Sequence, residues 1–344
     1  MKTYKSAIIG CGVIHELHAG VLAGNPHTTL KAVADINPAR AESSARKYGC
    51  TALTDYRDVL ADPEIDTVHI CTPHYLHAQM AIEAMKSGKH VLTEKPMAIS
   101  VEDCLRMTGV ARETGRQLGI CFQNRYNTTS LYIRKLLESG KAGRIIALKA
   151  SVTWLRGQDY YSSAPWRGTW AQEGGGVLIN QAIHTLDLLR WFAGKAVRIK
   201  GYTDTRFLED IIEVEDTAEA TIIFESGARG FFFATNGYAD SPVELQLVCE
   251  NAVMHLSDDL TVKYANGVTE VISDVHPKTG EKAYYGVGHS SLIEDFYNSL
   301  HTGKPFSVDG SQGVETIRLI QALYKSSETR AWVELQTGTA SNYQ

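Results

Sequence analysis

The sequence predicts two domains: an α/β domain with a doubly wound parallel sheet, and an α+β domain with a large, mostly antiparallel open sheet. Three observations support this prediction. Short apolar runs alternate with amphipathic stretches through the first 124 residues, longer strand-like runs follow, and Gly10-Cys11-Gly12 comes directly after the first apolar run. We therefore divide the chain into a first domain over residues 1–124 and a second over residues 125–344.

Five short runs rich in β-branched or aromatic residues are the expected strands of the first domain. In chain order they span residues 7–10, 30–35, 68–72, 90–93 and 118–122. The amphipathic stretches between them predict helices over residues 38–48, 76–87 and 101–114. Because parallel strands need crossovers of this kind, the alternation predicts a doubly wound parallel sheet.

The second part of the chain has a different pattern. A helix near residues 130–138 precedes the long expected strands, which span residues 144–154, 198–203, 217–225, 228–235 and 243–250. Turns at Glu225-Ser226-Gly227 and Ala265-Asn266-Gly267 join neighbouring runs as hairpins. A last helix is expected over residues 314–328. Hairpins and long strands together predict a largely antiparallel sheet.

Composition excludes several classes of protein. With 344 residues, 44% hydrophobic and 21% charged, the chain is that of a soluble globular protein with room for two cores. A net charge of -5 without a basic cluster argues against nucleic acid or an anionic membrane as partner. The six cysteines form no CxxC pair, and the sequence shows no signal-peptide pattern and no long apolar segment, so we expect reduced thiols and a cytoplasmic location.

The glycine pair Gly10 and Gly12 suits a turn that presents backbone N–H groups and a helix N-terminus to a pyrophosphate. The third glycine of that motif is absent, and His15 stands in its place. Asp35 ends the second expected strand, where a carboxylate would accept hydrogen bonds from both ribose hydroxyls of an adenosine. No arginine follows immediately, so a 2′-phosphate would meet a like charge, and NAD is favoured over NADP. The alternative of Asp35 as a helix cap is disfavoured, because Asn37-Pro38 already supplies a start signal.

Two further segments follow the ends of expected strands. Thr72-Pro73-His74 contains a proline that restricts the chain where a nicotinamide or ribose could lie. His74 and His77 have the simpler alternative of capping and starting the next helix. Glu94-Lys95-Pro96 puts Lys95 at the carboxyl end of a strand, where open α/β sheets bind their ligands. A solvated surface lysine is the simpler alternative, and the other motifs outweigh it.

Gly174-Gly175-Gly176 precedes an expected helix on which Asn180, His184 and Asp187 share one face. Because this face lacks Lys and Glu, we expect it to line a cleft. The alternative for His184 is a core histidine that is hydrogen-bonded to Asp187. We expect no metal site, since His15-Glu16-Leu17-His18 has the wrong spacing for an HExxH motif and no compact ligand cluster appears elsewhere.

Taken together, these motifs resemble the Gfo/Idh/MocA family, named for glucose-fructose oxidoreductase, inositol dehydrogenase and rhizopine catabolism proteins. The resemblance spans nearly the whole chain and rests on Gly10-Cys11-Gly12-Val13-Ile14, His18, Asp35, Thr72-Pro73, His77, Glu94-Lys95-Pro96, Gln123-Asn124-Arg125-Tyr126, Trp166-Arg167, and Gly174-Gly175-Gly176 through His184 and Asp187. It implies a Rossmann domain, an open C-terminal sheet that often mediates oligomers, and oxidation or reduction of sugars, polyols or their derivatives. In one departure, Asn180 stands where the family commonly has aspartate.

The sequence and the resemblance together define two expected sets of binding residues. The expected cofactor-binding residues are Gly10, Gly12, Val13, Ile14, Asp35, Thr72, Pro73, His74, Glu94 and Lys95. The expected substrate-binding residues are Lys95, Arg125, Trp166, Arg167, Asn180 and His184.

The expected catalytic residues are Lys95, His184 and Asn180. His184 would exchange the proton of the substrate hydroxyl, and the ammonium group of Lys95 would hydrogen-bond the same oxygen, once the cleft between the domains brings both together. Asn180 cannot accept a proton and would only position Lys95 or a substrate hydroxyl. Glu94 is expected to point away from the ligand or to support Lys95, without a chemical step of its own.

Three alternatives stay open. The reaction could be redox-neutral, with transient oxidation of a sugar carbon, elimination or hydrolysis, and recycling of the NAD. The protein could be a non-catalytic NAD sensor or scaffold, although such a module gains nothing from a Lys95 and His184 pair. The substrate could be a nucleotide-linked or acidic sugar, for which Arg125, Arg156 and Arg167 would offer anion partners.

The long strands of the second domain also bear on assembly. They would leave a broad sheet face on which apolar residues such as Phe231 and Phe233, or their alternating neighbours, need cover. We expect a homodimer or homotetramer formed through this sheet.

Overall fold

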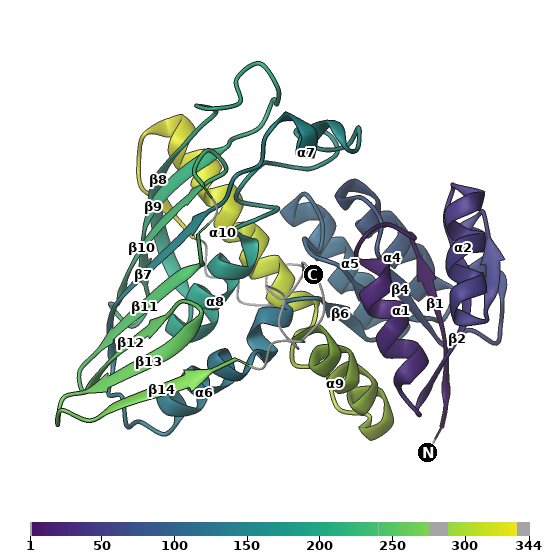
Figure 1. Cartoon of the computed structure of the whole chain (residues 1–344), viewed down its shortest axis with the longest axis horizontal. Coiled ribbons are helices and arrows are strands. Elements are labelled where there is room, and N and C mark those ends of the chain that lie inside the picture. The colour runs from purple at the N-terminus through teal and green to yellow at the C-terminus, as the bar shows by residue number, and fades with distance from the viewer. Residues whose placement is uncertain (1, 240, 275–287, 336–344) are drawn as a thin grey trace. The chain divides into compact units, whose positions relative to one another are not determined.

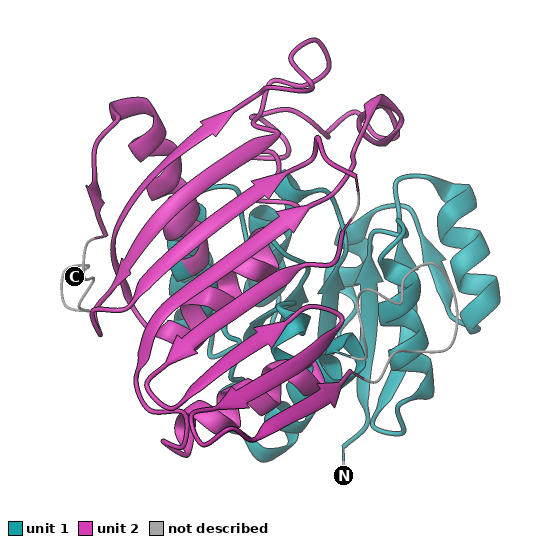
Figure 2. Ribbon diagram, turned by 60° about the vertical axis from the view of Figure 1, so that its left-hand side comes forward, with its two compact units in different colours: residues 1–126, 287–315 teal, residues 127–286, 316–344 magenta. Residues whose placement is uncertain are grey.

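The structure, a computed structural model, describes residues 2–239, 241–274 and 288–335. The chain forms two compact units, shown in two colours in Figure 2. Unit 1 consists of Met1–Tyr126 and Val287–Glu315, and unit 2 of Asn127–Gly286 and Thr316–Gln344. The boundary that we predicted after residue 124 lies close to the observed change from unit 1 to unit 2 after Tyr126. The prediction did not assign residues 287–315 to unit 1. That return depends on contacts made only in the folded chain, and no local pattern in the sequence signals it.

Unit 1 contains a six-stranded sheet in which every pair of neighbouring strands is parallel. Its order is β3-β2-β1-β4-β5-β6, the order of a doubly wound nucleotide-binding fold. The strands are β1 (Tyr4–Ile9), β2 (Thr28–Ala34), β3 (Thr51–Leu53), β4 (Thr67–Ile70), β5 (His90–Thr93) and β6 (Leu118–Ile120). The predicted fold class of the first domain is confirmed.

Helices connect these strands, and local signals set several of their ends. The helices are α1 (His15–Gly24), α2 (Pro38–Tyr48), α3 (Tyr56–Ala61), α4 (His77–Lys86), α5 (Val101–Thr114), α9 (Gly288–Thr302) and the short 3-10 helices η1 (His74–Leu76) and η2 (Gln123–Tyr126). At the start of α2, the Asn37 side chain accepts hydrogen bonds from the backbone N–H groups of Ala39 and Arg40. The helix ends at Gly49, whose φ of 68° is a left-handed conformation that glycine adopts without strain.

Unit 2 contains a nine-stranded sheet in the order β14-β13-β12-β11-β7-β10-β9-β8-β15. Its neighbours are antiparallel except for β7 and β10, which are parallel. The strands are β7 (Ile145–Thr153), β8 (Ala196–Asp204), β9 (Thr217–Phe224), β10 (Arg229–Thr235), β11 (Glu244–Cys249), β12 (Ala252–Leu256), β13 (Asp259–Tyr264), β14 (Thr269–Ser273) and β15 (Val333–Glu334). The predicted large, mostly antiparallel sheet is confirmed.

Helices α6 (Thr128–Glu138), α8 (Ile183–Ala193) and α10 (Gly310–Thr329) lie on one face of this sheet (Figure 1), and α10 passes from unit 1 into unit 2. The short helix α7 (Gln158–Ser162) lies beyond the ends of the strands. Side chains on the strands alternate between buried and more exposed, as in a sheet with one covered face. No described helix is long and apolar enough to cross a membrane.

Candidate active site

The turn after β1 is shaped by its first glycine. Gly10 has a φ of 95°, and a Cβ atom there would lie 2.6 Å from the carbonyl oxygen of Cys71, so no other residue fits without a backbone shift. A Cβ atom at Gly12 would meet nothing within 4 Å, so packing does not explain this second glycine. Next to it, the side chain of Val13 is 72% exposed. The turn therefore leaves open space beside the backbone at Gly12.

Asp35 lies beside this turn, at the end of β2. Its Oδ2 accepts a hydrogen bond of 2.7 Å from the backbone N–H of Cys11, and its Oδ1 accepts one of 2.8 Å from that of Asn37. The cap of α2 is Asn37, as described above. The adjacent Ile36 is 94% exposed, an unusual degree for an isoleucine, and our sequence reasoning did not single it out.

The segments after β4 and β5 are tied together by a buried imidazole. The Nε2 of His77 lies 2.8 Å from the carbonyl oxygen of Thr72, and its Nδ1 lies 2.7 Å from that of Pro96. His74 is also buried and begins η1. The structure thus links Thr72 with the segment that contains Lys95 inside unit 1, and His77 is the residue that joins them.

Glu94, directly before Lys95, is buried between two histidines from helices distant in sequence. His18 on α1 and His289 on α9 place their Nε2 atoms 2.9 and 3.4 Å from its Oε1. Burial would raise the pKa of Glu94, but the hydrogen bonds and charge of His18 and His289 outweigh it and hold the pKa well below the usual value. Our sequence reasoning did not assign His289 a role, since only the fold brings α9 here.

In unit 2, α8 starts later than the sequence pattern predicted. The expected single helix face with Asn180, His184 and Asp187 is wrong in one respect: α8 begins at Ile183, so Asn180 lies in the turn before the helix. All three side chains are buried. The carboxylate of Asp187 accepts a hydrogen bond of 3.0 Å from Thr316.

A separate turn precedes α8, because the backbone N–H of Ala182 bonds to the carbonyl of Val177 and so breaks the helical register before Ile183. The backbone N–H groups of Gly176 and Leu178 donate hydrogen bonds of 2.9 and 3.0 Å to the buried carboxylate of Glu215. A Cβ atom at Gly176 would overlap the backbone oxygen of Glu215, and one at Gly175 would overlap the Tyr324 hydroxyl. Glu215 thus anchors the start of the turn before α8, and nothing near Gly176 in the sequence points to it.

A second group of polar side chains gathers around the Tyr160 hydroxyl. Arg167 donates a hydrogen bond to it, and the amides of Asn180 and Gln181 do so at 3.1 Å each. Asn180 also donates to the carboxylate of Glu173, which is fully buried. The structure therefore brings Arg167 and Asn180 together, and Tyr160 and Glu173 are residues that sequence reasoning missed.

Guanidinium groups stack on the aromatic rings of this group. The guanidinium carbon of Arg167 lies 4.2 Å from the ring centre of Tyr160 and 4.6 Å from that of Trp166. Arg156 lies 5.5 Å from the Tyr160 ring. Trp166 and Arg167 are thus neighbours of Asn180 within unit 2.

Arg125 belongs to unit 1. It is buried in η2, its Nη1 donates a hydrogen bond of 3.1 Å to the side chain of Gln312, and its guanidinium lies over the ring of Phe122. Trp166 and Arg167 belong to unit 2, so Arg125 is not part of the same group of side chains.

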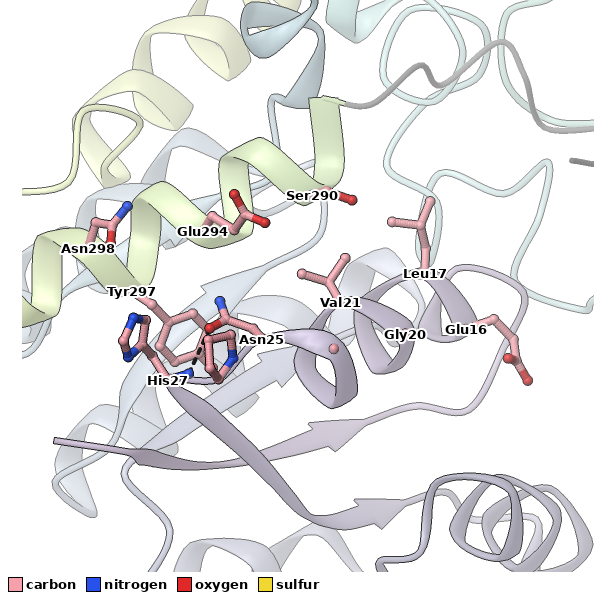
Figure 3. Close-up of a pocket in the computed structure, with 12 residues that line it drawn as sticks. Glu16, Leu17, Gly20, Val21, Asn25, His27, Ser290, Glu294, Tyr297 and Asn298 are labelled. Carbon is pink, nitrogen blue, oxygen red and sulfur yellow. Dashed lines mark hydrogen bonds between the residues drawn. The ribbon is translucent and has the colours of Figure 1, made fainter. Parts of the chain in front are cut away.

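A pocket of about 600 Å³ lies between α1 and α9 in unit 1 (Figure 3). Its wall includes the loop of Asn25 and His27, which enters β2 at its amino end. Open α/β sheets bind ligands at the carboxyl ends of their strands, so we do not identify this pocket as the active site.

The parallel sheet and its glycine turn define a nucleotide-binding class of protein, and comparison with known proteins identifies the family. Residues 4–122 match the oxidoreductase family with the NAD-binding Rossmann fold, and residues 130–255 match the GFO/IDH/MocA C-terminal domain. The chain belongs to the Gfo/Idh/MocA family of NAD-binding oxidoreductases.

Three similar proteins illustrate the range of the family. An uncharacterised oxidoreductase, YrbE of Bacillus subtilis (strain 168), is 29% identical, with 94% of each chain covered. Inositol 2-dehydrogenase of Rhizobium meliloti (strain 1021) is 26% identical, covering 94% of this chain and 97% of the relative. The crystal structure of the WlbA dehydrogenase from Bordetella pertussis, in complex with NADH and UDP-GlcNAcA, has a TM-score of 0.85 and 29% identity over 98% of this chain and 100% of that one.

Proposed function

We propose that this protein is an NAD-dependent dehydrogenase that acts on a hydroxyl or keto carbon of a sugar, a polyol or a sugar derivative. One observation carries the proposal. The turn at Gly10, Asp35, Thr72 and Lys95 follow β1, β2, β4 and β5, and these four strands are parallel neighbours in one sheet. Their carboxyl ends therefore share one edge, where this fold binds a dinucleotide. A lysine at that edge suits chemistry beside the nicotinamide.

The residues of unit 1 fit NAD. The space beside Gly12 suits a pyrophosphate at the start of α1, and the carboxylate of Asp35 suits a ribose diol. The exposed side chains of Val13 and Ile36 flank these positions and offer apolar cover for an adenine ring. NAD, when bound, supplies the hydride acceptor. A preference for NAD over NADP follows from the charge of Asp35.

The proton chemistry belongs to Lys95 and His184. We assign His184 to the exchange of the hydroxyl proton and Lys95 to a hydrogen bond with the same oxygen, where its ammonium stabilises a developing alkoxide. The amide nitrogen of Asn180 is committed to Glu173 and Tyr160, which supports an orienting role for this side chain. Asn180 cannot carry the proton, so the transfer falls to His184.

The group around Arg167 favours a substrate with a negative charge. Among the described residues, the Arg167 guanidinium pairs with no carboxylate, and its buried Nε–H has no acceptor. A partly buried guanidinium without a carboxylate partner suits an anionic group on a ligand. Uronates and nucleotide-linked sugars therefore belong among the candidate substrates, and the solved relative with bound UDP-GlcNAcA supports their inclusion.

The test replaces each member of the proposed pair. Lys95→Met and His184→Asn should each lower kcat by about 10²- to 10⁴-fold while leaving the Kd for NAD nearly unchanged. The double variant should lose less than the product of the two effects, because both residues act on one oxygen. The measurement is steady-state NADH formation on the best substrate from a panel of sugars, inositols and uronates, with Kd values from titration calorimetry.

Controls use the same substitutions at exposed positions, Lys86→Met on α4 and His255→Asn on β12, which should leave kcat unchanged. A stably folded His184→Asn protein with a normal kcat would show that His184 packs in the core and does not transfer the proton. Product formation with only catalytic amounts of NAD, and no net NADH, would replace the dehydrogenase by a redox-neutral enzyme.

A further inference from the structure

A cluster of three buried side chains with metal-binding donor atoms lies inside unit 1. His18 comes from α1, Glu94 from the segment after β5, and His289 from α9. Each side chain offers one donor atom, and the three donor atoms lie within 4.8 Å of one another. Among the described residues, no other group of three or more His, Cys, Asp or Glu side chains converges in this way. Two imidazoles and a carboxylate are a donor set that suits zinc.

The spacing of the donor atoms fits a shared metal ion. The Oε1 atom of Glu94 lies 2.9 Å from Nε2 of His18 and 3.4 Å from Nε2 of His289. Two ligands of a tetrahedral zinc ion, each about 2.0–2.1 Å from the metal, lie roughly 3.3 Å apart. The contact with His289 is long for a hydrogen bond, whose usual length is about 2.7–3.2 Å, and it is close to the spacing of two zinc ligands.

The far side of the His18 ring is held by a second buried imidazole. Its Nδ1 lies 2.8 Å from Nδ1 of His69, and Nε2 of His69 lies 2.9 Å from the Tyr297 hydroxyl. The proton shared by the two Nδ1 atoms is assigned to His18, because His69 can then donate from Nε2 to Tyr297. In this tautomer, Nε2 of His18 presents a lone pair to the Glu94 oxygen, an arrangement that a cation bound to both atoms stabilises. A ligand histidine whose other nitrogen is fixed by a neighbour is usual at metal sites.

Glu94 is held in the same manner at its second oxygen. Its Oε2 accepts a hydrogen bond of 3.2 Å from the backbone N–H of Lys95, which leaves Oε1 for the two imidazoles. The buried thiol of Cys121 also donates a hydrogen bond to this carboxylate, and it offers the fourth donor that tetrahedral zinc requires. Because all these groups are buried, the site has the closed character of a structural metal site, with no position for a substrate.

We propose that His18, Glu94 and His289 form a structural site for a divalent metal ion, which the donor set identifies as zinc. The ion fixes α9 to α1 and to the segment after β5, three parts of unit 1 that are far apart in the sequence. Our sequence analysis expected no metal site, because the ligands come from such distant segments that no spacing motif marks them. The site does not depend on the proposed catalytic role of Lys95.

The first test is the metal content of the purified protein. The untagged chain, produced with zinc in the medium and purified without chelators, should contain about one zinc ion per chain by elemental analysis. His289→Gln removes the ligand on α9 and should lower the zinc content to near zero, with folding of the variant checked by circular dichroism. The control is His255→Gln, the same change at an exposed histidine of β12, which should keep the full zinc content.

The second test uses the unsubstituted protein, so it does not depend on the folding of a variant. Removing the metal with a chelator should lower the Tm, and adding ZnCl₂ should restore it, because the ion binds the folded state. CoCl₂ added to the metal-free protein should produce the visible absorption bands of tetrahedral cobalt, and these bands should be absent in His289→Gln.

Three results would overturn the proposal. A folded unsubstituted protein that contains no metal and takes up neither zinc nor cobalt would show that the cluster is held by hydrogen bonds alone. Full zinc content in folded His289→Gln would place the metal elsewhere in the chain. An unchanged Tm after complete removal of the metal would exclude a structural role for it.

Discussion

At the scale of a single residue, Asp35 combines a structural role with capacity for a ligand. Its two oxygens accept backbone hydrogen bonds from Cys11 and Asn37, which fix the carboxylate against the glycine turn. An ionised carboxylate offers about four lone-pair sites, so roughly two remain for other donors. That capacity matches a ribose diol, and the fixed orientation means that little entropy is lost when the diol binds.

Replacing this carboxylate should change the choice of cofactor. Asp35→Ser removes the acceptors and the negative charge, so the affinity for NAD should fall roughly 10- to 100-fold, as expected for lost hydrogen bonds to a charged group. The affinity for NADP should hold or improve, because its 2′-phosphate no longer meets a like charge. Titration calorimetry with both cofactors measures the ratio of the NAD and NADP affinities. Asp55→Ser, the same change at the cap of α3, should leave it unaltered. Equal affinities of the unsubstituted protein for the two cofactors would refute the role of Asp35.

At the scale of an element, the segment Gly174–Gly176 is held by one buried acid. Burial raises the pKa of Glu215 to about 7 against the hydrogen bonds that it accepts from Gly176, Leu178 and Tyr324. Because the unfolded value is near 4.5, the folded state binds the proton more tightly. The stabilisation from this proton is complete below about pH 4.5 and is lost as the pH rises through 7.

Glu215→Gln should therefore alter how stability depends on pH. The variant lacks the titrating group, so its free energy of unfolding relative to the unsubstituted protein should rise between about pH 5 and pH 8, by up to about 3 kcal/mol. Burial keeps Tyr324 protonated over this range, so it adds no slope. Urea unfolding at several pH values measures the difference. Glu219→Gln, at an exposed position of β9, should show no such trend. If the free energies of unfolding of Glu215→Gln and the unsubstituted protein differed by the same amount at every pH, the raised pKa of Glu215 would be contradicted.

The same elements show which features were readable in the sequence. The bounds of α2 and α5 were predicted as observed, because Asn37 and Gly49, or Ser100 and Gly115, mark their ends locally. The start of α8 was not, since the helical hydrogen bonding is broken at Ala182, where no glycine or proline marks a boundary. The motif at Lys95 could be read because it follows a strand, but His289 reaches Glu94 only through the fold. Local caps and strand ends were predictable, whereas contacts between distant segments were not.

At the scale of the whole molecule, the nine-stranded sheet of unit 2 has one face without helices of that unit (Figure 2). Phe231 of β10 lies on this face and is 47% exposed. Its neighbours on the adjacent strands are Lys149 on β7 and Thr221 on β9. Val271 on β14 is also exposed. Nine strands of ordinary spacing and length present about 40 Å by 20 Å, or roughly 800 Å², to the outside. That area is about what each partner contributes to a stable interface.

We therefore expect a homodimer or homotetramer built through this face. Light scattering at micromolar concentration should give a mass that is twice or four times the chain's 37.9 kDa. Phe231→Lys would bury a charge from each subunit at the centre of the interface, which should weaken association at least about 30-fold if Phe231 contributes as a central aromatic does. Phe207→Lys, at an exposed phenylalanine outside the strands, is the matched control and should leave the mass unchanged. A monomeric parent protein, or an oligomer indifferent to Phe231→Lys but disrupted by Phe207→Lys, would place the subunit contact elsewhere and leave the sheet face as solvated surface.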